Sequence, residues 1–333
     1  MIRLGSAVTI GLMALSRIAQ LVAVILVIAT FNFVLVRAAP GDPAQVMAGQ
    51  SGAADPKLLE DLRKEYGLDK PYAVQLASYL WRVVRLDLGY SYRQRRAVVD
   101  LILERLPATL LLTVTAFCLA LLIGTILGAL AGLAAGSVLD TVFTVLSLVL
   151  YATPVFWLGL MLVLVFSVTL GWLPPFGYET INVKISPFEH VLDIAKHMIM
   201  PVTSLAAIYL AIYARLMRSS IIEVAQQDFI KTARAKGLSG PSIVVGHMLR
   251  NALVPVVTVA GMQAGALVGG AVVIETVFAW PGLGRLTFDA LLQRDYPVLL
   301  GIFLILSVVV IVLNLLTDLI YRLIDPRMTT GAA

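Results

Sequence analysis

Long apolar runs alternate with shorter polar stretches along most of this chain. Six apolar runs are bounded by charge, proline or glycine, and they cover residues 9–36, 106–134, 139–167, 199–217, 252–275 and 298–321. Each run is close to or above the length of about 20 residues that a helix needs to cross a bilayer. The pattern therefore predicts an all-α, polytopic membrane protein with six transmembrane helices.

The first two apolar runs are separated by a polar segment, residues 37–105. Its apolar positions recur with helical spacing in two places, so we expect amphipathic helices near Pro56–Tyr66 and Val74–Val84. Glycine, proline and aspartate cluster beside these helices and predict turns. Residues 37–105 are therefore expected to form a loop domain outside the membrane core.

The distribution of Lys and Arg in the short loops predicts the orientation of the chain. Six spans place both termini on one side, and the short loops on that side carry more Lys and Arg than those on the other. We therefore expect both termini in the cytoplasm, including the tail 322–333, and the 37–105 segment on the extracytoplasmic side.

A polar island, residues 215–251, separates the fourth and fifth spans. Charge this dense is costly in hydrocarbon, so the island must lie outside the membrane. Helical numbering from Glu223 to Lys236 places Phe229, Ala233 and Lys236 on one face. Gly237 then suits the position that ends a helix. We interpret the island as a short helical lever that a soluble partner grips, against the alternative of a solvated basic loop at lipid headgroups.

Two spans carry glycine at every fourth position, a spacing that lets helix backbones approach closely in lipid. The first set is Gly124, Gly128, Gly132 and Gly136, and the second is Gly261, Gly265 and Gly269. Either tight packing within one subunit or the lining of a subunit interface or pathway would explain them.

Composition and motifs exclude several kinds of chemistry. The chain is 59% hydrophobic and 14% charged, whereas a soluble domain is about a quarter charged. No phosphate-binding Gly-x-x-x-x-Gly-Lys-Ser/Thr loop occurs, and the three histidines lack metal-ligand spacing. We therefore predict no enzyme, no cofactor or metal bound by this chain, and no nucleic-acid partner.

Ionisable residues within or beside the spans are few and lie near span ends: Asp140, Glu275 and Asp318. Local pairing or interfacial anchoring is one interpretation of them, and a transport pathway is another. Of the deeper uncharged polar residues, Gln263 and Asn314 are the candidates for a translocation path.

Several runs of residues then resemble one known family. They are Pro40–Pro43, Gly67–Pro71, Asp87–Ser91, Asp228–Leu238, Arg250–Pro255, Trp280–Arg285, Arg294–Pro297 and Asp325–Arg327. They occur in the order of the dipeptide/oligopeptide/nickel family of bacterial ABC importer permeases, and the chain looks most like the B-type subunit of the dipeptide permeases. The general coupling pattern of such permeases is matched only at Ala233, Gly237 and Leu249.

The resemblance implies a type I importer permease fold with a core at residues 106–321, preceded by residues 1–36 with the first helix. It implies a heterodimer with a homologous permease, two ATP-binding subunits that use ATP and Mg²⁺, and an extracytoplasmic solute-binding protein, all at the bacterial inner membrane and in contact with membrane lipid. The residues that would couple to the ATP-binding subunit are Asp228, Phe229, Thr232, Ala233, Arg234, Ala235, Lys236, Gly237 and Leu238.

An outer segment has two interpretations. Its candidate functional residues are Glu275, Phe278, Trp280, Gly282, Gly284 and Arg285. They predict either an aromatic belt at the interface beside a tight turn, or part of an outer gate that faces the binding protein.

The expected function is import of di- or oligopeptides by alternating access. Nickel, glutathione, opines or oligosaccharides are alternative cargoes within the same family. An ion-coupled secondary carrier is a more distant alternative, which would need charged sites at the membrane midplane. An intramembrane enzyme would need paired acids or a His/Glu motif at depth.

Overall fold

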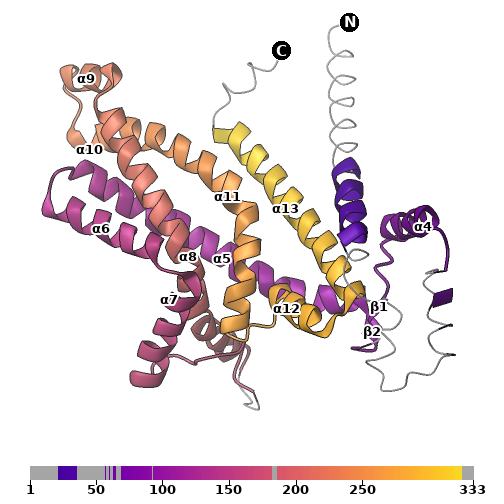
Figure 1. Cartoon of the computed structure of the whole chain (residues 1–333). Helices are drawn as coiled ribbons and strands as arrows, with labels where there is room; N and C mark the ends of the chain where they lie inside the picture. Colours follow the sequence, from indigo (N-terminus) through magenta and orange to yellow (C-terminus); the bar gives the residue numbers. More distant parts are fainter. Residues whose placement is uncertain are drawn as a thin grey trace, which may run out of the picture. The chain divides into compact units, whose positions relative to one another are not determined.

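The computed structural model describes residues 22–35, 57, 60, 63, 64, 69–91, 93–181 and 186–324, with the backbone alone at 264, 266–268 and 316–324. Besides the helix Val22–Leu35, the elements are α4 (Tyr72–Val84), β1 (Tyr90–Ser91), β2 (Arg96–Ala97), α5 (Val98–Leu133), α6 (Val138–Ala152), α7 (Val155–Leu162), η1 (Val163–Thr169), α8 (Pro187–Ala225), α9 (Asp228–Ala235), α10 (Gly240–Ile243), η2 (Val244–Leu249), α11 (Arg250–Val277), α12 (Leu283–Gln293) and α13 (Tyr296–Ile324). Figure 1 follows their order by colour.

Within the described residues, four helical segments are long and apolar enough to cross a membrane. They are Val98–Leu133, Pro187–Ala225, Gly240–Gln263 and Tyr296–Leu315, and a bent pair adds a fifth. The helical membrane architecture is thus confirmed for the spans predicted after the first. Of the first predicted span, 9–36, only residues 22–35 are described, so the count of six stays a prediction.

The third predicted span, 139–167, is broken rather than straight. Its two halves, Val138–Ala152 and Val155–Thr169, are bent by 105°, and Figure 1 shows the elbow between α6 and α7. Pro154 lacks the backbone N–H that would continue the helix and forces the preceding Thr153 into an extended conformation. The apolar composition of 139–167 predicted a single helix. The structure shows two helices, because Pro154 ends the first of them.

The chain divides into two compact units, and the larger contains Leu106–Arg285 with the described residues from Val312 onward. Its central element is α8, against which α6, α7 and α11 pack. Helix α8 begins with a capping box, in which Ser186 and Glu189 satisfy each other's backbone N–H groups. This cap explains why α8 starts well before the predicted span 199–217.

The first glycine ladder serves packing within this unit. A Cβ atom on Gly124, Gly128 or Gly132 would lie within 3.0 Å of atoms of α8, and on Gly128 it would lie 2.3 Å from the carbonyl oxygen of Ala214. The prediction of close backbone approach is confirmed for these three. Gly136 has a different role, because its φ of +83° with open space around it suits the turn after α5.

The smaller unit contains the described residues up to Arg105 together with Leu286–Ile311. Its apolar centre joins Ala29 of the helix Val22–Leu35, Val83 of α4 and Leu304 of α13. Strands β1 and β2 form an antiparallel pair. The amphipathic helix predicted at Val74–Val84 is confirmed as α4, whereas most of the one predicted at Pro56–Tyr66 lies outside the described residues.

A buried hydrogen bond inside the smaller unit joins two of the runs that carry the family resemblance, Asp87–Ser91 and Arg294–Pro297. The hydroxyl of Ser91, which ends β1, donates to the carboxyl of Asp295 over 2.5 Å. Asp295 directly precedes α13, and its side chain is buried. Burial raises the pKa of Asp295, while the hydrogen bond from Ser91 opposes that rise. The two motifs therefore meet although about 200 residues separate them.

Candidate functional site

The polar island contains a short separate helix, α9, at Asp228–Ala235. Helix α8 ends at Ala225, and Gln227 is extended with φ −68° and ψ 147°. The predicted continuous helix from Glu223 to Lys236 is therefore wrong at its start. The break turns α9 away from α8, so that α9 stands as an element of its own at one end of α8 (Figure 1).

The end of α9 is fixed by Gly237. Its N–H donates to the carbonyl of Arg234 over 2.9 Å, and the N–H of Leu238 donates to the carbonyl of Ala233 over 3.3 Å. This pair of bonds defines a Schellman cap, which requires a left-handed residue. Gly237 supplies it with φ +77°. The predicted role of this glycine in ending the helix is confirmed.

Two side chains anchor α9 to the body of its unit. Ile230 and Ala233 lie one turn apart on the helix and are both buried, in the same core as Ile243 of α10 and Met248 of η2. Ala233 therefore faces inward with Ile230, so that of the predicted face of Phe229, Ala233 and Lys236 only Phe229 and Lys236 are exposed. The anchor holds α9 against the unit by apolar packing.

The remaining residues of α9 present charge beside exposed apolar surface. Phe229 is 44% exposed and Leu238 is 41% exposed. The other residues predicted to couple to a partner are also exposed: Asp228, Thr232, Arg234, Ala235, Lys236 and Gly237. Lys231 pairs with Asp228 over 2.8 Å at the surface, a contact that contributes little to stability. We call Phe229, Thr232, Lys236 and Leu238 the α9 surface.

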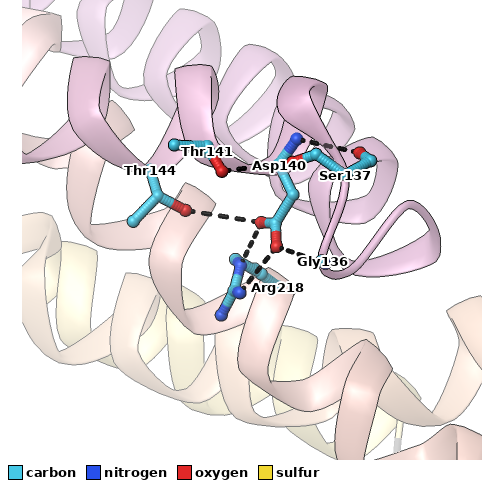
Figure 2. A network of polar contacts seen from close by, with 6 residues as sticks. All are labelled: Gly136, Ser137, Asp140, Thr141, Thr144 and Arg218. Atoms are coloured by element: carbon cyan, nitrogen blue, oxygen red, sulfur yellow. Dashed lines mark hydrogen bonds and ion pairs between the residues drawn. The ribbon is translucent and has the colours of Figure 1, made fainter.

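Helix α8 is joined to α6 by a bidentate ion pair, shown in Figure 2. Nε and Nη2 of Arg218 donate to the two carboxyl oxygens of Asp140 over 2.5 and 2.8 Å. The N–H of Gly136 and the hydroxyl of Thr144 also donate to this carboxylate. Asp140 is buried and lies in the first turn of α6, where the helix dipole favours negative charge.

This pairing confirms the local interpretation of Asp140 and was not visible in the sequence. Asp140 and Arg218 are 78 residues apart, and only the packing of α6 on α8 brings them together. One turn earlier on α8, Arg215 stacks over the ring of Tyr151 of α6, with 4.5 Å between the guanidinium carbon and the ring centroid. The end of α8 that leads to α9 is thus held to α6 at two points.

The segment from Glu275 to Arg285 is folded inward around the Glu275 carboxylate. Glu275 is buried, and it accepts hydrogen bonds from the hydroxyl of Thr109 over 2.7 Å and from the N–H of Arg285 over 3.1 Å. A Cβ atom on Gly282 would lie 2.3 Å from this carboxyl group. Glycine at 282 is therefore required by the approach of Glu275.

Phe278 and Trp280 are buried in the same segment, so the expectation of an aromatic belt at the lipid interface is corrected. The indole N–H of Trp280 donates to the carbonyl of Ala108 over 2.9 Å. Thr109, which also accepts a hydrogen bond from the N–H of Leu283, is a central residue that sequence reasoning missed. Its partners come from a distant part of the chain, and no local pattern marks it.

The two residues predicted to line a path have different surroundings. The side-chain oxygen of Gln263 on α11 is buried without a hydrogen-bond partner among the described residues, as is the hydroxyl of Tyr213 on α8. Asn314 on α13 is exposed. In the part of the chain that the structure describes, no three metal-ligating side chains gather into a site.

Comparisons with known proteins give a consistent result. Residues 124–330 match the family "Binding-protein-dependent transport system inner membrane component", and residues 12–113 match the N-terminal family of the same systems. The chain is 42% identical over 315 residues to a putative peptide transport system permease protein of Brucella abortus, covering 94% of this chain and 98% of the relative. It is 39% identical over 331 residues to the dipeptide transport system permease protein DppB of Escherichia coli, covering 94% and 97%.

A solved structure shares the fold. A chain in a structure of the inward-facing MetNI methionine ABC transporter matches with a TM-score of 0.54 at 18% identity, covering 68% of this chain and 97% of that one. This chain belongs to the family of inner membrane components of binding-protein-dependent transport systems, and it is a multi-pass permease of an ABC transport system.

Proposed function

We propose that this chain is a permease subunit that imports di- or oligopeptides across the bacterial inner membrane, driven by ATP hydrolysis in partner subunits. The similarity to permeases named for peptide and dipeptide transport supports this cargo. Both termini and α9 lie in the cytoplasm, as the distribution of Lys and Arg predicts. Residues 37–105 and the Glu275–Arg285 segment then lie toward the outer side.

The observation that carries the proposal is the construction of α9. Aromatic side chains, including phenylalanine, are enriched in protein interfaces. Here Phe229 is exposed, while Ile230 next to it fixes the helix to the core. The Gly237 cap stops the helix after two turns. A rigid helix that packs on its own core through Ile230 and Ala233 and exposes its other side chains can transmit the movement of a docked subunit to the spans.

The mechanism follows from these connections. An ATP-binding subunit, which carries ATP and Mg²⁺, docks on the α9 surface, and closure of two such subunits moves α9. The movement reaches α8 and, through Arg218 and Asp140, α6. The spans then change from an inward-facing to an outward-facing arrangement. Such switching requires that the docked subunit binds the two arrangements with different affinity.

The remaining partners and sites follow the same scheme. A second, homologous permease completes the pathway, and a solute-binding protein delivers cargo outside. The buried hydrogen bonds around Glu275 support the outer gate. Two polar side chains are candidates to contact a peptide on its path: Gln263, whose side-chain oxygen has no hydrogen-bond partner among the described residues, and the exposed Asn314. We expect ATP and Mg²⁺ to be bound by the partner subunits and not by this chain.

Co-purification of the complex tests the proposal. The chain is co-expressed with its neighbouring permease and ATP-binding subunits, and Phe229→Asp is compared with Phe176→Asp, which alters another exposed phenylalanine outside α9. We expect Phe229→Asp to reduce the amount of ATP-binding subunit that co-purifies and to reduce peptide uptake, while Phe176→Asp retains the ATP-binding subunit. Retention of that subunit and normal uptake in Phe229→Asp would contradict docking on α9.

Cargo is tested separately by uptake. Competition of labelled dipeptide uptake by unlabelled peptides, nickel, glutathione, opines and oligosaccharides identifies the solute that the complete system takes. Strong competition by peptides alone is expected. Competition by one of the other solutes alone would keep the permease assignment and replace the cargo.

A further inference from the structure

Helix α4 is apolar on two opposite faces. One face contains Gln75, Tyr79 and Val83 and packs into the smaller unit. Half a helical turn away, Val74, Trp81 and Val84 are exposed, with Trp81 at 58% and Val84 at 62%. A polar outer face is the usual pattern for a helix that covers a core in water. The outer face of α4 therefore does not suit an aqueous environment.

The inner face of α4 rests on the flank of apolar helices. Val83 packs with Ala29 of the helix Val22–Leu35 and with Leu304 of α13, and the rings of Phe33 and Tyr79 stack with 5.8 Å between their centroids. Figure 1 shows α4 beside the helix Val22–Leu35 and running across its axis. Because Val22–Leu35 belongs to the predicted first span, 9–36, a helix that runs across it runs along the plane of the bilayer.

The position of Leu304 sets the depth of α4. Helix α13 has 29 residues and is about 43 Å long, which matches the thickness of about 40–45 Å for a bilayer with its headgroups. Leu304 lies about 12 Å from the start of α13, and the headgroup layer on each side is about 7 Å thick. The contact between α4 and α13 thus falls about 5 Å to the acyl side of the boundary between headgroups and acyl chains, within the depth of about 5–10 Å that interfacial helices reach.

The outer face also carries the side chains that favour this boundary. The guanidinium carbon of Arg85 lies 4.6 Å from the centroid of the Trp81 ring. Tryptophan is enriched at membrane interfaces because one part of the ring is apolar and the other donates a hydrogen bond. Arg85 can pair with a lipid phosphate while its stem covers the ring. The outer face of α4 can therefore bury apolar side chains in acyl chains and place Arg85 against a lipid phosphate.

We propose that α4 is an interfacial helix whose Val74–Trp81–Val84 face lies in the outer-leaflet boundary of phospholipid, with Arg85 at the phosphates. It anchors the segment between the first two spans to the membrane surface. The inference concerns the smaller unit and does not depend on what α9 binds. It therefore stands or falls separately from the proposed docking of an ATP-binding subunit.

Spin-label accessibility in the complete transporter tests the proposal. Cys118 is the only cysteine, so Cys118→Ala provides the background for single cysteines. Val84→Cys reports on the outer face of α4, Val27→Cys on an exposed position of the apolar helix Val22–Leu35, and Asp87→Cys on the turn that follows α4. Each carries a nitroxide in phospholipid nanodiscs, and power saturation compares oxygen with Ni-EDDA.

We expect position 84 to resemble position 27, with severalfold greater relaxation by oxygen than by Ni-EDDA, and position 87 to show the reverse. Ni-EDDA access at position 84 equal to that at 87 would overturn the proposal in favour of a water-facing helix. Low access to both reagents would overturn it in favour of a protein that covers α4, whether the solute-binding protein, the second permease or another part of this chain.

A second measurement requires no introduced cysteine and no spin label. Brominated phospholipid quenches tryptophan fluorescence at short range, and the difference in quenching between the unmodified chain and Trp81→Phe isolates the contribution of Trp81. Strong quenching by lipids brominated near the headgroup is expected. A difference close to zero, in a complex that is otherwise intact, would contradict contact of Trp81 with lipid.

Discussion

Substitution of Gly237 changes the end of α9 without creating a collision. A Cβ atom at this position would have no other atom within 4 Å, so the cost of alanine comes only from the backbone at φ +77°. An L-residue in the left-handed region costs about 1 kcal/mol, which lowers the population of the capped helix about fivefold. Proline also removes the N–H that donates to Arg234 and cannot adopt this φ, at a cost of about 3 kcal/mol or more.

The assay is the initial rate of labelled peptide uptake by cells, divided by the amount of the chain in the membrane fraction. We expect Gly237→Ala to lower uptake up to about fivefold and Gly237→Pro to abolish it, with membrane insertion unchanged in both. Gly240→Ala is the matched control, because Gly240 also lies in open space but has no positive φ. Its uptake should equal that of the unmodified chain.

Two results would refute this reasoning. Normal uptake in Gly237→Pro would show that the geometry at the end of α9 does not matter for transport. A loss in Gly240→Ala as large as that in Gly237→Ala would show that any side chain in this loop interferes, so that the left-handed backbone of Gly237 is not the cause.

Three further predictions concern packing, charge and pH. Gly128→Ala should destabilise the purified complex by about 1–3 kcal/mol, because its Cβ would meet the carbonyl of Ala214; an unchanged melting temperature would contradict this. Asp140→Asn should reduce assembly and uptake by leaving the Arg218 guanidinium without its carboxylate, and adding Arg218→Met should restore assembly but not uptake; full recovery of uptake would assign the pair a purely structural role. The raised pKa of Asp295 means that the folded state retains this proton to a higher pH than the unfolded chain, so its contribution to stability is present below about pH 4 and is lost as pH rises through the raised pKa. Asp295→Asn should flatten that dependence in thermal melts, and an identical pH profile would refute it.

Local features of this chain were predictable because their causes are local. The left-handed cap at Gly237 follows from a glycine placed after a short amphipathic run, and α4 follows from its helical spacing of apolar residues. The close approach of a helix backbone at Gly128 follows from glycine at every fourth position, although the identity of that helix as α8 does not. In each case the residues that produce the feature lie within one or two turns of one another.

The long-range contacts were not predictable in the same way. The bond between Thr109 and Glu275 spans 166 residues, and nothing near Thr109 marks it as the partner of a buried carboxylate. Trp280 looked like an interfacial residue because sequence cannot distinguish an aromatic ring at the lipid boundary from one packed inside. The elbow at Pro154 was missed because strong apolar composition concealed a single helix-breaking residue.

Docking of an ATP-binding subunit on α9 requires that α9 lies on the cytoplasmic side of the membrane. An impermeant thiol reagent is applied to intact cells that carry Ala235→Cys in a Cys118→Ala background, and then to inverted membrane vesicles. We expect no labelling in intact cells, labelling in inverted vesicles, and protection there when the ATP-binding subunits are present. Labelling of position 235 from outside intact cells would place α9 on the wrong side of the membrane and contradict the account.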